Sequence, residues 1–198
     1  MSNEDKGKYQ PLIYYQLMEI SLRELLVEKG VVTDEAVNAE VQAMRSRTPE
    51  RGAQVVAKAW SDPAYKERLL KNGTAACEEI GLEIPALKLV AVENTPQVHN
   101  VIVCTLCSCY PRVLLGIPPD WYKSRNYRSR MVREPRAVLE EFGVRVAESV
   151  AIRVHDSTAD MRYIVLPMRP KGTEGWDESK LATLVTRDSM IGVAVPTA

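Results

Sequence analysis

The 198-residue chain has no long apolar run, few aromatic residues and no net charge. It contains one phenylalanine and four cysteines, and its 26 basic residues balance 26 acidic ones. No stretch approaches the roughly 18 apolar residues that a membrane-spanning helix needs. A neutral chain also lacks the general field that attracts nucleic acid or an anionic membrane, which argues against a polyanion-binding role.

The cysteines are too few and too clustered for a disulfide scaffold. Cys104, Cys107 and Cys109 fall within six residues, while Cys77 stands alone. The first ten residues, MSNEDKGKYQ, are polar and charged, so no secretory signal is expected and the chain is expected to be cytoplasmic. In a reducing compartment such clustering indicates metal or redox chemistry rather than a crosslink.

What the chain does contain is a change of hydrophobic period near Gly81. Before Gly81, helices are predicted at about 17–29, 33–43, 48–60, 63–71 and 75–80. After it, strands are predicted at 87–92, 98–103, 150–154, 162–166 and 191–195, with helices over 118–142 and 178–185. The predicted fold class is α+β, with helices over 1–81 forming an N-terminal arm that packs on a partner subunit. A layered α-β-β-α metal-binding domain, 82–198, follows.

The most informative segment is the loop VCTLCSCY, residues 103–110, directly after a predicted strand. Two thiolates at i and i+2 straddle one residue, so both sulfurs and the intervening backbone nitrogens can face one metal. Such small chelate rings favour a flat arrangement of two sulfurs and two nitrogens, from which tetrahedral zinc gains little. Amide nitrogens bind only when deprotonated, which needs a strongly polarising trivalent ion. Low-spin cobalt or iron fits this donor set.

Other interpretations stay open on the residues alone. The three cysteines can be buried as small hydrophobic residues, or can form a zinc site completed by His99 or Cys77. A dithiol redox loop is disfavoured because the strand–C-x-x-C–helix context of thioredoxin-like proteins is missing. His99 and His155 are predicted to be structural, since their spacing makes no catalytic triad. Asp156 is predicted to have a structural role or to support the site from behind.

The loop VCTLCSCY resembles the metal-binding loop of the nitrile hydratase α subunit in its cobalt version. The iron version usually carries serine where Thr105 stands. The resemblance continues in ENTP at 93–96, GIPPDWYKS at 116–124, VREPR at 132–136, RYIVLP at 162–167, GTEGW at 172–176 and IGVA at 191–194. It covers about residues 15–195.

The resemblance implies the catalytic subunit of a lyase, EC 4.2.1.84, which hydrates a nitrile to the amide. It implies one non-corrin Co3+ per chain, with iron less favoured. Cys104 would be the axial thiolate and Cys107 and Cys109 the equatorial sulfurs, while the backbone nitrogens of Ser108 and Cys109 complete the plane. In the family the sulfur matching Cys107 is oxidised to sulfinate and that matching Cys109 to sulfenate.

The resemblance also implies partners. A β-type subunit would supply two arginines that hold the oxidised sulfurs, and a metallochaperone or activator is a further expected partner. The substrate would be a small-molecule nitrile. Neither nucleic acid nor a membrane is expected.

Two departures from the family concern the substrate pocket. Arg112 stands where a tryptophan usually follows Tyr-Pro, and Pro85 stands where many nitrile hydratases have glutamine. Thiocyanate hydrolase, whose γ subunit shares the loop, also has arginine at the first position, so the chain resembles the branch of toyocamycin nitrile hydratase and thiocyanate hydrolase. Arg112 is predicted as a catalytic-site residue, able to stack on a heteroaromatic ring or pair with an anion. The alternative functions are a γ-type catalytic subunit of thiocyanate hydrolase and, behind it, a non-catalytic zinc or iron-sulfur protein.

Overall fold

The computed structural model describes residues 14–85, 87–107 and 109–198, and the chain divides into two compact units, Met1–Met44 and Arg45–Ala198. The first unit holds α1 (Tyr14–Glu28) and most of α2 (Asp34–Ser46). Arg23 joins these helices by donating to Asp34 Oδ1 over 2.7 Å and to Asn38 Oδ1 over 2.8 Å. No residue of either helix is buried. Packing of the helical arm on a partner subunit stays a prediction.

The second unit carries the remaining helices and all strands of the described residues. They are α3 (Glu50–Ser61), α4 (Pro63–Lys71), α5 (Gly73–Glu79), β1 (Lys88–Glu93), β2 (Val98–Val103), α6 (Arg112–Leu115), α7 (Asp120–Lys123), α8 (Arg125–Arg133), α9 (Pro135–Glu141), β3 (Ala151–Asp156), β4 (Met161–Leu166), α10 (Glu178–Ala182) and α11 (Arg187–Ile191). Side-chain caps begin several helices, as where Asp62 accepts the amide of Tyr65. None of the helices in the described part of the chain has the length and hydropathy of a membrane span.

The strands form two parallel pairs, β1 with β4 and β2 with β3. Parallel pairing needs a long connection, and the helices from α6 to α9 provide it between β2 and β3. The register sets Leu89 opposite Arg162 in the first pair and Val103 opposite Asp156 in the second. Since parallel strands end at the same edge, the end of β3 lies beside the residue that precedes Cys104.

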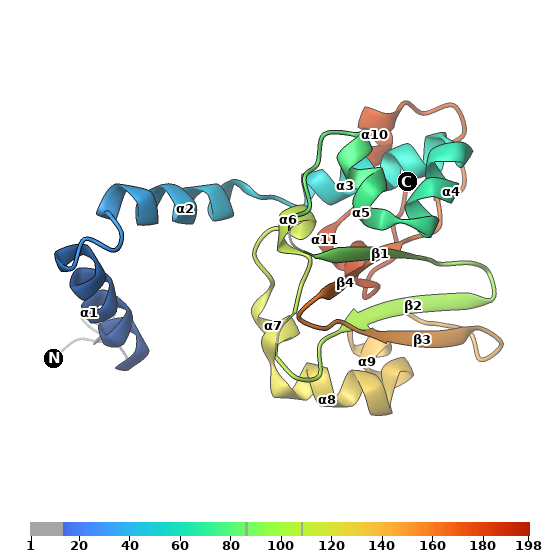
Figure 1. The fold of residues 1–198 in the computed structure, drawn as a ribbon. Coiled ribbons are helices and arrows are strands. Elements are labelled where there is room, and N and C mark those ends of the chain that lie inside the picture. Colours follow the sequence, from blue (N-terminus) through green and yellow to red (C-terminus); the bar gives the residue numbers. More distant parts are fainter. Residues whose placement is uncertain (1–13, 86, 108) are drawn as a thin grey trace, which may run out of the picture. The chain divides into compact units, whose positions relative to one another are not determined.

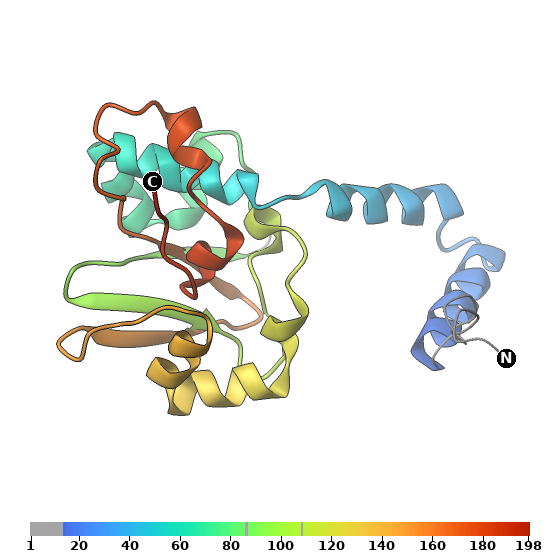
Figure 2. The ribbon, with the colours of Figure 1, turned by 180° about the vertical axis from the view of Figure 1, so that it is seen from behind.

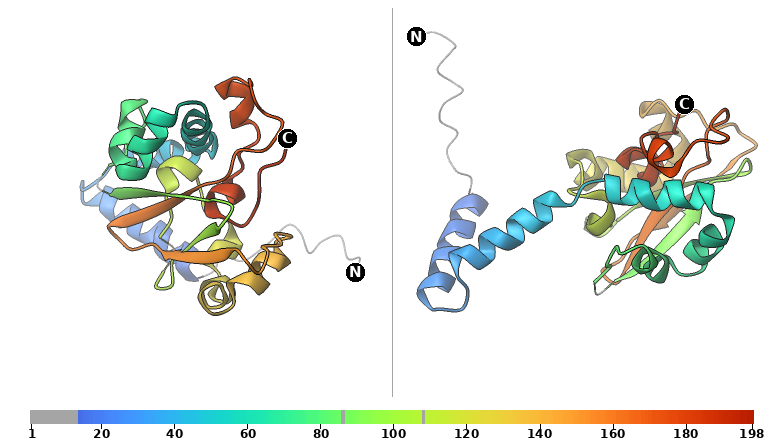
Figure 3. Two further views of the ribbon diagram at one scale, coloured as in Figure 1. Left: turned by 90° about the vertical axis from the view of Figure 1, so that its right-hand side faces the viewer. Right: turned by 90° about the horizontal axis from the view of Figure 1, so that it is seen from above.

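Helices cover the strand pairs on both sides (Figure 1). From top to bottom in that view lie α3–α5 with α10, then β1 and β4, then β2 and β3, and finally α8 with α9. The same order is seen from behind in Figure 2 and in the left view of Figure 3. One core cluster joins Val55 of α3, Val101 of β2, Leu139 of α9 and Ile164 of β4, all buried. The predicted α+β class is confirmed.

The predicted terminal strand at 191–195 is wrong. The chain there leaves α11, which begins with a capping box between Thr186 and Ser189 and ends at Gly192. Gly192 has φ +96°, and a Cβ at this position would clash with the backbone of Asn100. The apolar side chains of Ile191 and Val193 are buried without strand pairing, and α11 packs against both β4 and β2.

The single helical region predicted over 118–142 is also divided. Ser124 ends α7 and accepts the amide of Tyr127 to begin α8, and Pro135 starts α9 directly after Glu134. A proline at the first helical position has no amide to lose, so it begins a helix more readily than it continues one. The three short helices place Tyr122 and Tyr127 on the side of the core.

Candidate metal centre

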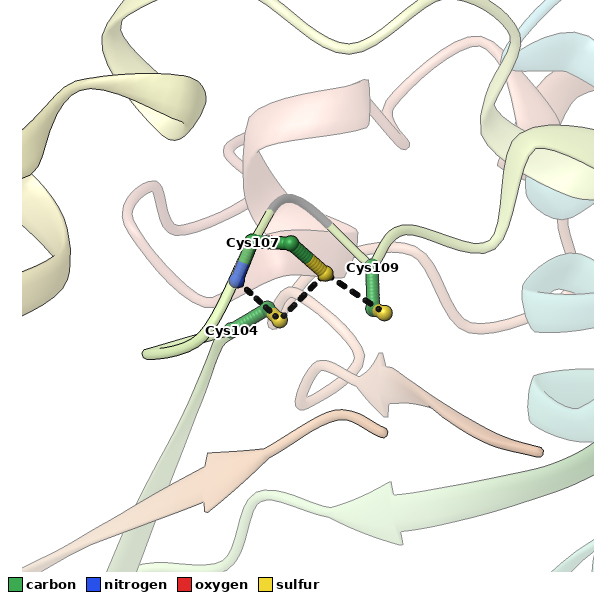
Figure 4. A group of neighbouring side chains, drawn as sticks. All are labelled: Cys104, Cys107 and Cys109. Atoms are coloured by element: carbon green, nitrogen blue, oxygen red, sulfur yellow. Dashed lines mark hydrogen bonds between the residues drawn. The ribbon is translucent and has the colours of Figure 1, made fainter. Parts of the chain in front are cut away.

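The cysteine loop leaves β2 at Val103 and carries its three thiols to one point. Cys104 is 1% exposed, Cys109 is half-buried and Cys107 is exposed. The Sγ atoms of Cys104 and Cys107 lie 3.5 Å apart, those of Cys107 and Cys109 lie 3.2 Å apart, and all three lie within 4.8 Å of one another. Figure 4 shows the sulfurs turned toward one another, with the amide of Cys107 directed at Cys104 Sγ over 3.4 Å. Ser108, the fourth predicted ligand residue, lies outside the described residues.

Asp156 fastens the start of the loop. Its Oδ1 accepts the amide of Thr105 over 2.9 Å, and its Oδ2 accepts the Thr105 hydroxyl over 2.5 Å. The register of β2 with β3 brings these residues together across 51 positions of sequence. Arg128 of α8 donates to the Thr105 carbonyl over 3.3 Å from the other side. The turn that follows Cys104 is therefore held by residues of β3 and α8.

Tyr122 fastens the end of the loop. Its hydroxyl donates to the carbonyl oxygen of Cys109 over 2.9 Å, and its side chain is fully buried. The next residue, Tyr110, is buried and packs edge-on against Tyr122, with ring centroids 5.0 Å apart. Between these two contacts, Leu106 is 87% exposed and Cys107 is exposed.

Burial and neighbouring groups disfavour the thiolate of Cys109 in the chain without a metal ion. Burial is the largest cause that raises the pKa of the Cys109 thiol to about 12, and hydrogen bonds with Cys107 and Cys104 add to it. The nearby Arg162 guanidinium acts in the opposite direction. A metal cation would stabilise the thiolates in the same way but far more strongly, and three soft sulfur donors suit a transition metal. The residues of the loop therefore fit a resident metal ion.

The alternative ligands proposed for zinc lie elsewhere. His99 is buried with its Nε2 2.7 Å from the Gly192 carbonyl, and burial lowers the pKa of its ring. Cys77 is a core thiol of α5, whose pKa burial raises to about 12. Neither belongs to the cysteine cluster, which within the described ranges is the only group of potential metal ligands. The exposure of Cys107 also contradicts the interpretation of three buried hydrophobic thiols.

His155 has a structural partner, as predicted. Its Nε2 lies 2.8 Å from Asn100 Oδ1. The side-chain Nδ2 of Asn100 donates in turn to the Glu93 carbonyl over 2.7 Å. These contacts link β3 to β2 and β1 behind the loop. His155 therefore offers no catalytic group to the cysteines.

A cavity with a volume of 370 Å³ opens beside Cys107 and Cys109. Its lining consists of Leu87, Cys107, Cys109, Tyr110, Arg112, Val113 and Arg162. Arg112, the predicted third site residue, is exposed at the start of α6 and does border it. Pro85 is not among the lining residues. Two cysteines and two arginines thus line the same cavity.

Sequence reasoning missed Arg162 and Tyr122 as residues of the site. Arg162 reaches the cavity because β4 pairs with β1, and Tyr122 reaches Cys109 because α7 folds back below the loop. Tyr122 lies within the quoted segment GIPPDWYKS and Arg162 within RYIVLP, so the family resemblance did include both residues. Their roles could not be read from spacing, because neither is near a cysteine in the chain.

Comparisons with known proteins agree with this geometry. The model of the nitrile hydratase alpha chain family matches residues 13–194. The chain is 52% identical over 176 residues to the cobalt-containing nitrile hydratase subunit alpha of Pseudonocardia thermophila, covering 87% of this chain and 86% of that protein. It is 44% identical over 194 residues to thiocyanate hydrolase subunit gamma of Thiobacillus thioparus, covering 92% and 80%. Among solved structures, a double mutant of the Fe-type nitrile hydratase of Comamonas testosteroni Ni1 matches with a TM-score of 0.89 at 47% identity, covering 96% and 93%.

Proposed function

The chain belongs to the nitrile hydratase alpha-chain family, and we propose that it is the metal-carrying catalytic α subunit of a cobalt nitrile hydratase. Such an enzyme is a lyase that adds water to a nitrile and yields the amide. The observation that carries the proposal is the convergence of three cysteine sulfurs within 4.8 Å, on a loop fastened at both ends and open to a cavity.

The proposed cofactor is one non-corrin Co3+ per chain, held by Cys104, Cys107 and Cys109 and by the backbone nitrogens of Ser108 and Cys109. The cobalt-containing relative and the three sulfur donors support cobalt, while the Fe-type structural relative keeps iron as the second choice. When bound, the ion supplies a Lewis acid that polarises the nitrile and makes water more acidic. A cytoplasmic setting is part of the proposal, because thiols persist in a reducing compartment.

The three cysteines differ in exposure, and we propose that they differ in role accordingly. Cys104, almost wholly buried, anchors the centre from below, whereas Cys107 and Cys109 border the cavity. We propose that the two accessible sulfurs are the oxidised ones, Cys107 as sulfinate and Cys109 as sulfenate, since oxidation follows access as well as thiolate character. The oxidised Cys109 would then be the group beside the substrate that takes part in catalysis.

Arg112 is proposed to select the substrate. Arg112 lines the cavity together with Arg162, and its side chain carries a planar cation with five donors. A planar guanidinium stacks on an aromatic face better than it packs on a small alkyl group. A heteroaromatic nitrile is therefore the preferred substrate class.

A second candidate reaction uses the same site. Two guanidiniums at one cavity also suit an anion, and the chain is 44% identical to a thiocyanate hydrolase subunit gamma. Thiocyanate is small enough for a 370 Å³ cavity and carries the nitrile-like C–N group that the metal would polarise. The chain would then be a γ-type catalytic subunit.

The proposed partners are a β-type subunit and a metallochaperone or activator. The support lies in the exposed surface of the chain: α1 presents Tyr15 at 76% and Leu22 at 58% exposed, and Leu106 projects from the loop. Apolar side chains at these exposures are typical of surfaces that a partner covers. Two arginines of the β-type subunit would hold the oxygens of the modified cysteines.

The test is an assay of the chain purified together with its β-type partner after maturation with cobalt. Aliphatic nitriles, heteroaromatic nitriles and thiocyanate are offered in parallel. Amide formation supports the hydratase, and preferential loss of thiocyanate supports the second candidate. A Cys109→Ala variant should lose turnover, while Cys77→Ala, a matched loss of one thiol in the core, should retain it. Equal activity of both variants would show that Cys109 is not needed for catalysis and would contradict the proposal.

A further inference from the structure

We propose that Tyr122 is a positioning residue of the metal centre, whose hydroxyl fixes the backbone of Cys109 in the orientation that metal binding requires. The inference rests on the proposed function and deepens it. Its physical basis is a single buried hydrogen bond, from the Tyr122 hydroxyl to the Cys109 carbonyl oxygen at 2.9 Å.

The hydroxyl of Tyr122 has a fixed position because its ring cannot move. The side chain has no exposed surface, and three aromatic rings surround it. The ring centroid of Tyr110 lies 5.0 Å away, that of Tyr127 lies 5.6 Å away and that of Trp121 lies 6.0 Å away. Dense packing of this kind holds a side chain in one rotamer. The aromatic cluster therefore presents one donor at one point below the loop.

The acceptor of this hydrogen bond is the carbonyl oxygen of Cys109, a proposed metal ligand at the edge of the cavity. Cys109 is the last sulfur donor, its Sγ lies 3.2 Å from that of Cys107, and it borders the cavity. Cys107 and Leu106 before it are exposed, so packing does not fix this part of the loop. Among the described residues, Tyr122 is the only one whose side chain donates to the backbone of Cys109. Fixing that carbonyl restricts the ψ angle of Cys109 and so limits the positions open to its Cα and its sulfur.

Tyr127 offers a matched comparison five residues away. It is also buried, belongs to the same aromatic cluster and donates its hydroxyl to a backbone carbonyl, that of Ile102, over 2.7 Å. Ile102 lies within β2 and is held by pairing with His155 of β3. Loss of the Tyr127 hydroxyl therefore removes an equivalent buried bond without releasing the loop.

The experiment compares the cobalt-loaded holoenzyme with its Tyr122→Phe and Tyr127→Phe variants. Four quantities are measured: cobalt per chain, the sulfur-to-cobalt charge-transfer absorption, the rate of cobalt loss to excess EDTA at raised temperature, and the thermal midpoint. Loss of a residue that orients metal ligands typically weakens a site by about 10–100-fold. Tyr122→Phe should therefore release cobalt about tenfold faster and shift the absorption band, while Tyr127→Phe stays within about twofold of wild type. Both thermal midpoints should fall by similar amounts.

Equal release rates and unchanged spectra in all three proteins would overturn the proposal, as would equal changes in both variants. If Tyr122→Phe does not fold, 4-aminophenylalanine and 4-methylphenylalanine at position 122 fill the same space with and without a donor. The proposal then requires wild-type release only for the amino side chain, and equal behaviour of the pair contradicts it. A wild-type protein that holds no cobalt would instead refute the proposed function, so the two failures are distinguishable.

Discussion

Replacement of Asp156 by alanine should loosen the start of the cysteine loop. The change removes both acceptors of Thr105, the one for its amide at 2.9 Å and the one for its hydroxyl at 2.5 Å. Asparagine at the same position retains one carbonyl acceptor and can donate to the hydroxyl, so it preserves the two contacts without the charge. The series from aspartate through asparagine to alanine therefore weakens the two hydrogen bonds to Thr105 in steps.

The magnitude follows from the strength and exposure of the two bonds. A hydrogen bond to an ionised group contributes about 1.5–3 kcal/mol when buried. Asp156 is exposed, so water replaces part of what is lost, and about 2 kcal/mol for both bonds is a reasonable total. For a chain of this size that loss lowers the thermal midpoint by about 4–8 °C. A loosened loop should also bind cobalt about tenfold more weakly.

The assay is cobalt per chain and thermal midpoint for Asp156→Ala, Asp156→Asn and a control, Asp160→Ala. Asp160 lies in the turn between β3 and β4, and within the described residues its carboxylate takes part in no hydrogen bond or ion pair. We expect Asp156→Ala to carry less cobalt per chain than wild type, Asp156→Asn to lie between the two, and the control to match wild type. If Asp156→Ala loads cobalt as fully as the control, the carboxylate does not organise the loop and the reasoning is wrong.

Three further outcomes are expected. Arg112→Trp replaces a cation by a flat apolar side chain at the cavity. The ratio of kcat/KM for small alkyl nitriles to kcat/KM for heteroaromatic nitriles should then rise about tenfold, while cobalt per chain stays constant. An unchanged substrate ranking would make Arg112 structural. A trivalent ion with amide ligands exchanges slowly, so the wild-type holoenzyme should keep its cobalt in EDTA at neutral pH and ordinary temperature, and rapid loss would point to a labile site. The intact mass of active, aerobically matured protein should exceed the sum of chain and metal by about three oxygens, two on Cys107 and one on Cys109. Peptides with both thiols unmodified, taken from active enzyme, would rule this modification out.

The sequence was sufficient to locate the metal loop and the family. The strand predicted at 98–103 coincides with β2, and the cysteines do follow its end, because β-branched residues favour strands and a strand end leaves the next residues free to turn. The quoted motifs extended the resemblance over most of the chain, and the match over residues 13–194 confirms it.

The sequence could not show which distant residues support the loop. Asp156 and Arg162 reach it only through parallel pairing of strands far apart in the chain, and no local pattern encodes that pairing. The predicted strand at 191–195 failed for a related reason. The buried side chains of Ile191 and Val193 flank a glycine that turns the chain, and a short apolar run does not distinguish such packing from a strand.

Metal analysis of the native complex by mass spectrometry decides whether the cysteine loop holds cobalt. The convergence of Cys104, Cys107 and Cys109 on one point is assigned here to a resident cobalt centre. We expect cobalt close to one per chain in the active complex, and its loss in a Cys104→Ala variant. Stoichiometric zinc or acid-labile sulfide in place of cobalt, in protein that retains full activity, would contradict it.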